Sequence, residues 1–124
     1  MKILIAAGGT GGHIWPALSF NQWIVRSRGH VESLFLSGSR DMEKELYRHA
    51  GVAPVVLPVE GSPLSGPLGT RVSRTVDLAR SIGEVGRVVR EFSPHICLLF
   101  GGYVSVPAMV VSKMKGVPIL LHEP

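Results

Sequence analysis

A glycine-rich hexapeptide near the N-terminus, Gly8–His13 (GGTGGH), most constrains what this chain can fold into. The five residues before it, Ile3–Ala7, are all apolar, which is typical of a buried parallel strand. After it, Pro16 stands where the first turn of a helix tolerates proline, and apolar residues continue at helical spacing. The hexapeptide therefore predicts a tight turn that leads from a buried strand into a helix of residues 14–28.

A turn of this kind favours the binding of an anion. Glycines let the main chain approach a ligand, and the free N–H groups and the dipole of the helix favour negative charge. We therefore expect a phosphate or a sugar phosphate near Thr10–His13. The turn lacks the spacing and the lysine of a P-loop. It also does not fit the GxGxxG pattern of dinucleotide-binding proteins, and Ser37–Ser39 stands where such proteins have an acidic residue that binds a ribose, so a dinucleotide ligand is disfavoured. Close packing of helix on strand, without a ligand, is the alternative.

Composition sets the class of protein. The chain has 124 residues, enough for one domain, and its 45% apolar and 18% charged content is typical of a soluble globular protein. The net charge of +4 suits an anionic partner, but no basic run alternates with aromatic residues, so we expect no nucleic-acid partner. Cys97 lies in an apolar run, which predicts a buried thiol in a reducing compartment. No apolar stretch reaches the roughly 18–20 residues of a membrane span, so a cytoplasmic setting is expected.

The rest of the chain alternates between strand-like and helix-like patterns. Pro54 and Pro58 make the third expected strand short or place it near an edge of the sheet. Five strands alternating with four helices predict an α/β fold, a Rossmann-like, doubly wound parallel sheet with right-handed crossovers. The further expected strands cover residues 30–36, 53–59, 94–100 and 117–123, the further helices cover 41–50, 71–92 and 104–115, and a loop covers 61–69.

Three polar clusters follow the first, fourth and fifth expected strands: Gly9–His13, Gly101–Ser105 and His122-Glu123. The carboxyl ends of parallel strands are where ligands bind in an open α/β sheet. His13 is the strongest single candidate, because a histidine in an anion-binding turn can accept a proton near neutral pH. The alternative is that its ring only hydrogen-bonds a neighbouring loop.

The other two clusters contain weaker candidates. Tyr103 and Ser105 could contact a ligand, although Ser105 could instead cap the helix that follows. Glu123 could orient a histidine or bind a sugar hydroxyl, and a plain loop carboxylate is the alternative. No cluster has the spacing of metal ligands, so we expect no metal.

Three segments together resemble the start of the MurG family, the N-acetylglucosaminyltransferases of peptidoglycan synthesis. They are the GGTGGH turn with Pro16-Ala17-Leu18, Gly101–Ser105 with Pro107, and Pro118 with His122-Glu123. The resemblance covers the whole chain and implies a two-domain GT-B glycosyltransferase, peripheral to the cytoplasmic side of the bacterial plasma membrane. It implies inverting transfer of GlcNAc from UDP-GlcNAc to the 4-hydroxyl of undecaprenyl-diphospho-MurNAc-pentapeptide (lipid I to lipid II), with no metal and no other cofactor.

The resemblance also implies roles for particular residues. The N-terminal domain of such enzymes mainly receives the lipid acceptor, and the C-terminal domain holds most of the UDP-sugar. Thr10, Gly11 and Gly12 match the residues that reach the donor, and His13 matches the histidine that acts as, or assists, the base on the acceptor hydroxyl. The residues matched to the acceptor and its diphosphate are Gly101, Gly102, Tyr103, Ser105 and Glu123.

Docking to the membrane in this family uses an apolar patch ringed by basic residues. The candidates here are Leu64, Leu68, Arg71 and Arg74. A surface loop followed by a solvated helix end is the alternative.

The C-terminus departs from the family pattern. Pro124 stands where a glutamine usually follows the His-Glu pair, and the asparagine that contacts the donor would come next. We expect residues 1–124 to be the N-terminal acceptor-binding domain without its C-terminal UDP-sugar domain, and to be inactive alone. The alternatives are a subunit of a split glycosyltransferase, which predicts an exposed apolar face along the fifth strand, and a non-catalytic nucleotide- or phosphate-binding module.

Overall fold

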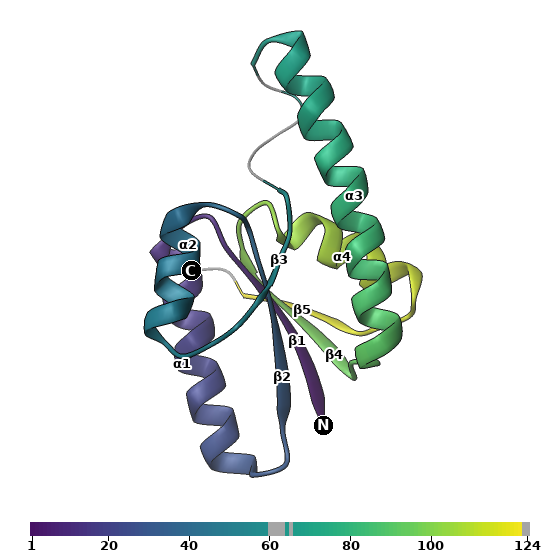
Figure 1. The fold of residues 1–124 in the computed structure, drawn as a ribbon. Helices are drawn as coiled ribbons and strands as arrows, with labels where there is room; N and C mark the ends of the chain where they lie inside the picture. Colours follow the sequence, from purple (N-terminus) through teal and green to yellow (C-terminus); the bar gives the residue numbers. More distant parts are fainter. Residues whose placement is uncertain (60–63, 65, 123–124) are drawn as a thin grey trace.

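The computed structural model describes residues 1–59, 64 and 66–122. Within this part of the chain, the strands form one five-stranded parallel sheet in the order β3-β2-β1-β4-β5 (Figure 1). The strands are β1 (Lys2–Ala7), β2 (Glu32–Ser37), β3 (Val55–Val56), β4 (Ile96–Gly101) and β5 (Ile119–Leu121). The helices are α1 (Gly11–Arg28), α2 (Asp41–His49), α3 (Leu68–Phe92) and α4 (Ser105–Met114).

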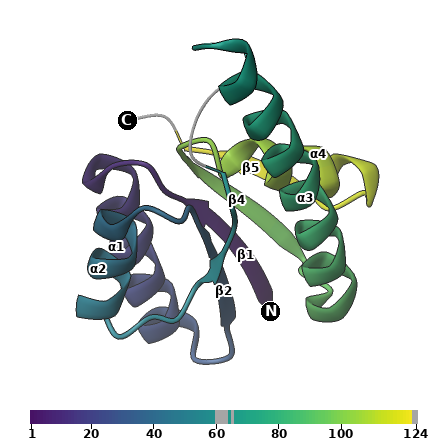
Figure 2. The ribbon, with the colours of Figure 1, turned by 45° about the horizontal axis from the view of Figure 1, so that its top comes forward.

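Helices cover both faces of the sheet, α1 and α2 on one face and α3 and α4 on the other (Figures 1 and 2). Side chains of β1 alternate between the two resulting cores. Ile3 and Ile5 pack with the core under α1 and α2, whereas Leu4 and Ala6 pack with the core under α3 and α4. Burial on both faces explains why the central strands are continuously apolar. The predicted doubly wound parallel sheet is confirmed.

The central position of β1 determines which loops meet. β1 pairs with β2 on one side and with β4 on the other, and its last residue, Ala7, lies opposite Gly101 of β4. The turns that follow β1 and β4 therefore leave the same edge of the sheet side by side.

Several element boundaries differ from the sequence-based expectation. β3 comprises two residues instead of residues 53–59, at the edge of the sheet, because Pro54 and Pro58 flank it and proline donates no hydrogen bond to a ladder. β5 is also shorter than the expected strand of residues 117–123. α1 starts at Gly11, within the glycine-rich turn, since the first N–H groups of a helix need no intrahelical partner.

The long helix α3 also starts earlier than expected, directly after Pro67, so that Leu68 belongs to the helix and not to a loop. Its C-terminal half packs on the sheet through buried Val85, Val88 and Val89. Its N-terminal half extends beyond the sheet (Figure 1), and Leu68 there is 76% exposed.

The sequence also led to expectations about Cys97 and about membrane-spanning segments. Cys97 is fully buried, as predicted, and burial raises the pKa of its thiol. None of the helices in the described residues is both long enough and apolar enough to span a bilayer.

Candidate functional site

The first glycine loop, Gly8–His13, leaves β1 and turns directly into α1. Gly9 has a φ of +85°, a conformation that favours glycine. Thr10 is the N-cap of α1, and its carbonyl oxygen accepts hydrogen bonds from the N–H groups of His13 and Ile14 at 3.1 and 3.2 Å. A helix leaves its first N–H groups without intrahelical acceptors, and here these groups open onto the carboxyl edge of the sheet. The loop thus has the backbone geometry expected of an anion site.

The second glycine loop, Gly101–Ser105, lies directly against the first. The N–H of Gly8 donates to the carbonyl oxygen of Gly101 at 3.2 Å. A Cβ atom on Gly102 would overlap the carbonyl group of Gly8, so the two backbones meet at a distance that only glycine allows. Gly101 and Gly102 also have positive φ angles of +130° and +86°. The structure therefore brings together the two loops that the sequence separates by about ninety residues.

His13 lies where the two loops meet. Its Nδ1 is 3.0 Å from the carbonyl oxygen of Gly8. Because a carbonyl oxygen only accepts, Nδ1 carries the proton, and the lone pair of the neutral ring is on Nε2. The ring of His13 packs so closely against Gly101 that a Cβ atom on Gly101 would lie 2.5 Å from Cδ2 of the ring. The half-buried imidazole is therefore held in the tautomer whose lone pair is on Nε2.

The remaining candidates of the second loop are placed as follows. Tyr103 is 47% exposed at the tip of the loop. Ser105 is the first residue of α4, the N-cap is Val104, and no side chain caps this helix, so the interpretation of Ser105 as a capping residue is wrong. The hydroxyl of Ser105 is buried and has no hydrogen-bond partner among the described residues.

The third cluster is only partly described. The ring of His122 lies beside that of Phe100, with centroids 5.0 Å apart, and the backbone N–H of His122 donates to the carbonyl oxygen of Leu99. Glu123 lies outside the described residues. An apolar groove of about 250 Å³ separates α1 from this end of the sheet, and it is lined by Pro16, Phe20, Leu98, Phe100, Leu120 and His122.

Sequence reasoning missed Glu43 of α2, which supports the first glycine loop. This carboxylate is only 2% exposed. Its Oε1 accepts from the N–H of Gly9 at 2.5 Å and from the N–H of Gly38 at 3.2 Å, and its Oε2 accepts from the N–H of Arg40 at 3.0 Å. The last bond belongs to the capping box of α2.

Tyr47, one turn further along α2, supports the end of β1. Its buried hydroxyl donates to the carbonyl oxygen of Ala7 at 2.6 Å. Burial, and secondarily the charge of Glu43, raise the pKa of this phenol far above its ordinary value. A signal for both residues was present, because Glu43 stands at helical spacing from Leu46 and Tyr47 on the apolar side of α2.

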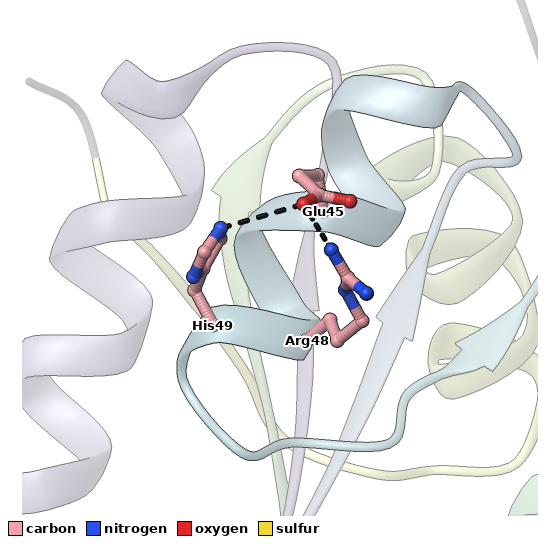
Figure 3. A network of polar contacts seen from close by, with 3 residues as sticks. All are labelled: Glu45, Arg48 and His49. Carbon is pink, nitrogen blue, oxygen red and sulfur yellow. Dashed lines mark hydrogen bonds and ion pairs between the residues drawn. The ribbon is translucent and has the colours of Figure 1, made fainter.

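The exposed side of α2 carries a different polar network. Glu45 pairs with Arg48 and His49, as Figure 3 shows. The hydrogen bond from Arg48 lowers the pKa of the Glu45 carboxyl below its ordinary value. All three side chains are exposed, so this network is a solvated surface feature and not part of the site. In the part of the chain that the structure describes, no group of three or more His, Cys, Asp or Glu side chains could hold a metal ion.

Comparison with known proteins adds a family. Residues 3–124 match the model of the glycosyltransferase family 28 N-terminal domain.

Curated relatives carry the name UDP-N-acetylglucosamine–N-acetylmuramyl-(pentapeptide) pyrophosphoryl-undecaprenol N-acetylglucosamine transferase. The relative from Moorella thermoacetica is 33% identical over 123 residues, which are 99% of this chain and 33% of the relative. The relative from Magnetococcus marinus is 37% identical over 124 residues, with 98% of this chain and 33% of the relative covered. The chain therefore spans about a third of the length of the curated relatives it matches.

Solved structures share the fold. MurG of Acinetobacter baumannii superposes with a TM-score of 0.80 at 23% identity, over 98% of this chain and 35% of that one. The UDP-GlcNAc 2-epimerase of Neisseria meningitidis, solved with UDP-GlcNAc bound, gives a TM-score of 0.69 at 15% identity, over 99% of this chain and 32% of that one.

Proposed function

Because this chain belongs to glycosyltransferase family 28 as its N-terminal domain, we propose that it is the acceptor-binding part of an N-acetylglucosaminyltransferase. The enzyme transfers GlcNAc from UDP-GlcNAc to undecaprenyl-diphospho-MurNAc-pentapeptide, converting lipid I into lipid II. Residues 1–124 act with a C-terminal domain that holds most of the UDP-sugar. The proposal is supported by the names of the curated relatives, of which this chain spans a third.

The observation that carries the proposal is the position of His13 between the two glycine loops. In the proposed reaction, Nε2 of His13 takes the proton of the acceptor 4-hydroxyl as its oxygen attacks the anomeric carbon of GlcNAc. The bond from that carbon to the diphosphate of UDP breaks, and UDP leaves with the electron pair. Support comes from the hydrogen bond between Nδ1 and Gly8, which leaves Nε2 free to accept a proton.

In this proposal each glycine loop contacts a different substrate. Thr10, Gly11 and Gly12 reach the UDP-sugar from the N-terminus of α1, where the helix dipole favours a diphosphate. The second loop, with Tyr103 and Ser105, binds the diphosphate of the lipid acceptor in this proposal, and Glu123 is proposed as a further acceptor-binding residue.

The test is a transfer assay with UDP-GlcNAc and a soluble lipid I analogue. Residues 1–124 are assayed alone, and then joined to the remaining two thirds of the Moorella thermoacetica relative. We expect transfer only from the joined protein. Transfer by residues 1–124 alone would contradict the assignment of the donor to a second domain. No transfer by a joined protein that folds would contradict the proposed function and favour a nucleotide- or phosphate-binding module.

A second arrangement with the same chemistry is a split enzyme whose catalytic partner is a separate polypeptide. One observation favours it: Leu120 and Leu121 of β5 are more than half exposed, as a partner-binding face would require. Transfer that appears when the second domain is added as an unlinked polypeptide is the result expected from this arrangement.

A further inference from the structure

We propose that Glu43 is a positioning residue for His13, acting through the peptide group between Gly8 and Gly9. This inference rests on the proposed function, because it assigns Glu43 to the support of the proposed base.

The hydrogen bonds form a continuous chain across one peptide group. The N–H of Gly9 donates to Oε1 of Glu43 at 2.5 Å. The carbonyl oxygen of the same peptide group belongs to Gly8, and it accepts from Nδ1 of His13 at 3.0 Å. One peptide group therefore links the buried carboxylate of Glu43 to the imidazole of His13: its N–H donates to the carboxylate, and its C=O accepts from Nδ1–H.

This arrangement holds the peptide group in one orientation. If the group rotated by half a turn, the carbonyl oxygen of Gly8 would face the carboxylate of Glu43, and two acceptors would repel each other in a buried site. A hydrogen bond to a charged acceptor also polarises the peptide group and strengthens its carbonyl oxygen as an acceptor. Both effects favour the tautomer of His13 that has its proton on Nδ1 and its lone pair on Nε2.

The surrounding residues leave room for the carboxylate. A Cβ on Gly38 would lie 2.6 Å from both carboxylate oxygens, and a Cβ on Gly8 would overlap Oε1. A glycine from each of the loops after β1 and β2 is therefore needed for Glu43 to reach the Gly9 N–H.

Capping of α2 is the competing structural role, and one variant isolates it. Arg40→Pro removes the N–H that Oε2 accepts, and the φ of −69° at Arg40 already suits proline. Because it also removes the Arg40 side chain, Arg40→Ala, which keeps the N–H, is measured beside it. Arg40→Pro leaves the bonds from Gly9 and Gly38 to Oε1 in place. Glu43→Gln instead replaces the carboxylate with an amide. An amide can present either a donor or an acceptor to Gly9, so the orientation of the Gly8–Gly9 peptide group is no longer fixed.

The first measurement is the tautomer of His13, read from its ring ¹⁵N chemical shifts in the 124-residue chain. We expect the Nδ1-protonated tautomer in the unsubstituted chain and in Arg40→Pro, and a mixture of tautomers in Glu43→Gln. An Nε2-protonated ring in the unsubstituted chain, or an unchanged tautomer in Glu43→Gln, would overturn the inference. This readout does not depend on transferase activity, so it stands apart from the test of the proposed function.

The second measurement is steady-state transfer by the joined protein. We expect Glu43→Gln to lower kcat by about 10–100-fold, as is typical for partners that orient a catalytic group, with little change in KM for UDP-GlcNAc. Equal losses in Arg40→Pro would overturn the inference, because they would assign the effect to the cap.

Gly38→Ala is a second route to the same result if Glu43→Gln does not fold. Its methyl group displaces the carboxylate and keeps the charge, and we expect the same change in the His13 tautomer and in kcat. Gly83→Ala on α3, where a Cβ meets no atom within 4 Å, is the matched glycine control. A Gly38→Ala variant that keeps the parent tautomer and kcat would overturn the inference.

Discussion

At the scale of single residues, the proposed mechanism gives the two nitrogen atoms of His13 separate tasks. Nδ1 attaches the ring to the Gly8 carbonyl group, and Nε2 is left for chemistry. Asparagine reproduces the first task and not the second, because its side-chain N–H₂ can reach the Gly8 carbonyl from a position close to that of Nδ1.

We therefore expect His13→Asn to lower kcat of the joined protein by about 10²–10⁴-fold while stability changes little. The reason is that the loop keeps its hydrogen bond and loses only the base. Steady-state transfer and urea unfolding, measured on the same preparations, check this. Turnover close to that of the parent protein would exclude His13 as the base.

Tyr47 allows a prediction on stability and its dependence on pH. Tyr47→Phe removes the donor to Ala7 and leaves a buried carbonyl group unpaired, which costs about 1–2 kcal/mol. Burial raises the pKa of the Tyr47 phenol above the unfolded value of about 10, so its contribution is complete below about pH 10 and is lost as the pH rises toward the folded-state value.

Urea unfolding at pH 8 and at pH 11 measures both effects. We expect the difference in unfolding free energy between the parent and Tyr47→Phe to be smaller at the higher pH. Tyr103→Phe is the matched control, because the Tyr103 side chain is exposed and its loss should leave stability unchanged at both values. A constant difference for Tyr47→Phe would contradict the assignment.

At the scale of elements, the N-terminal half of α3 is the part of the fold that the core does not explain. Leu68, Val72 and Val76 follow at intervals of four residues and are all exposed, with Arg71 beside them. Leu64, just before the helix, is also exposed. Apolar side chains beside arginines are the chemistry that binds an anionic lipid surface, so we propose this half of α3, with Arg74, as the membrane-docking element.

We expect Leu68→Gln with Val72→Gln to lower partitioning onto vesicles of anionic phospholipid by about 10–100-fold, because two apolar side chains no longer enter the interface. Co-sedimentation of the 124-residue chain with such vesicles measures this. Val25→Gln is the control, since Val25 is exposed on α1, on the other side of the sheet. Unchanged partitioning of the double variant would exclude this surface.

The elements also differ in how far the sequence predicts them. Continuous apolar runs predicted β1 and β4 well, because burial on both faces leaves no room for polar residues. The start of α3 was predicted too late, since Pro67 and Gly69 suggest a loop although proline is also well suited to precede a helix. The position of Glu43 on the apolar side of α2 indicated its burial, but the pattern could not identify its partners, which are backbone N–H groups of other segments.

At the scale of the whole molecule, the meeting of the two glycine loops was predictable and the hydrogen bonds within it were not. Parallel strands carry their following turns to one edge, so loops after β1 and β4 were expected to share that edge. Which strands are neighbours follows from packing of the full chain. The pairing of β1 with β4 places Gly101 against the ring of His13, and the hydrogen bond from Nδ1 to Gly8 fixes the tautomer of that ring.

The central place of β1 in the sheet has a consequence for how this chain folds. β1 needs partners on both sides, and one of them, β4, follows it in the sequence by about ninety residues. Strand pairs that are far apart in the sequence form slowly, because the entropy cost of closing a large loop comes before any favourable contact is made. During synthesis β1 can pair early with β2, but its other edge stays open until β4 leaves the ribosome. The junction of the two glycine loops at His13 is then among the last parts of the domain to form, and a nascent chain stalled before β4 lacks this junction.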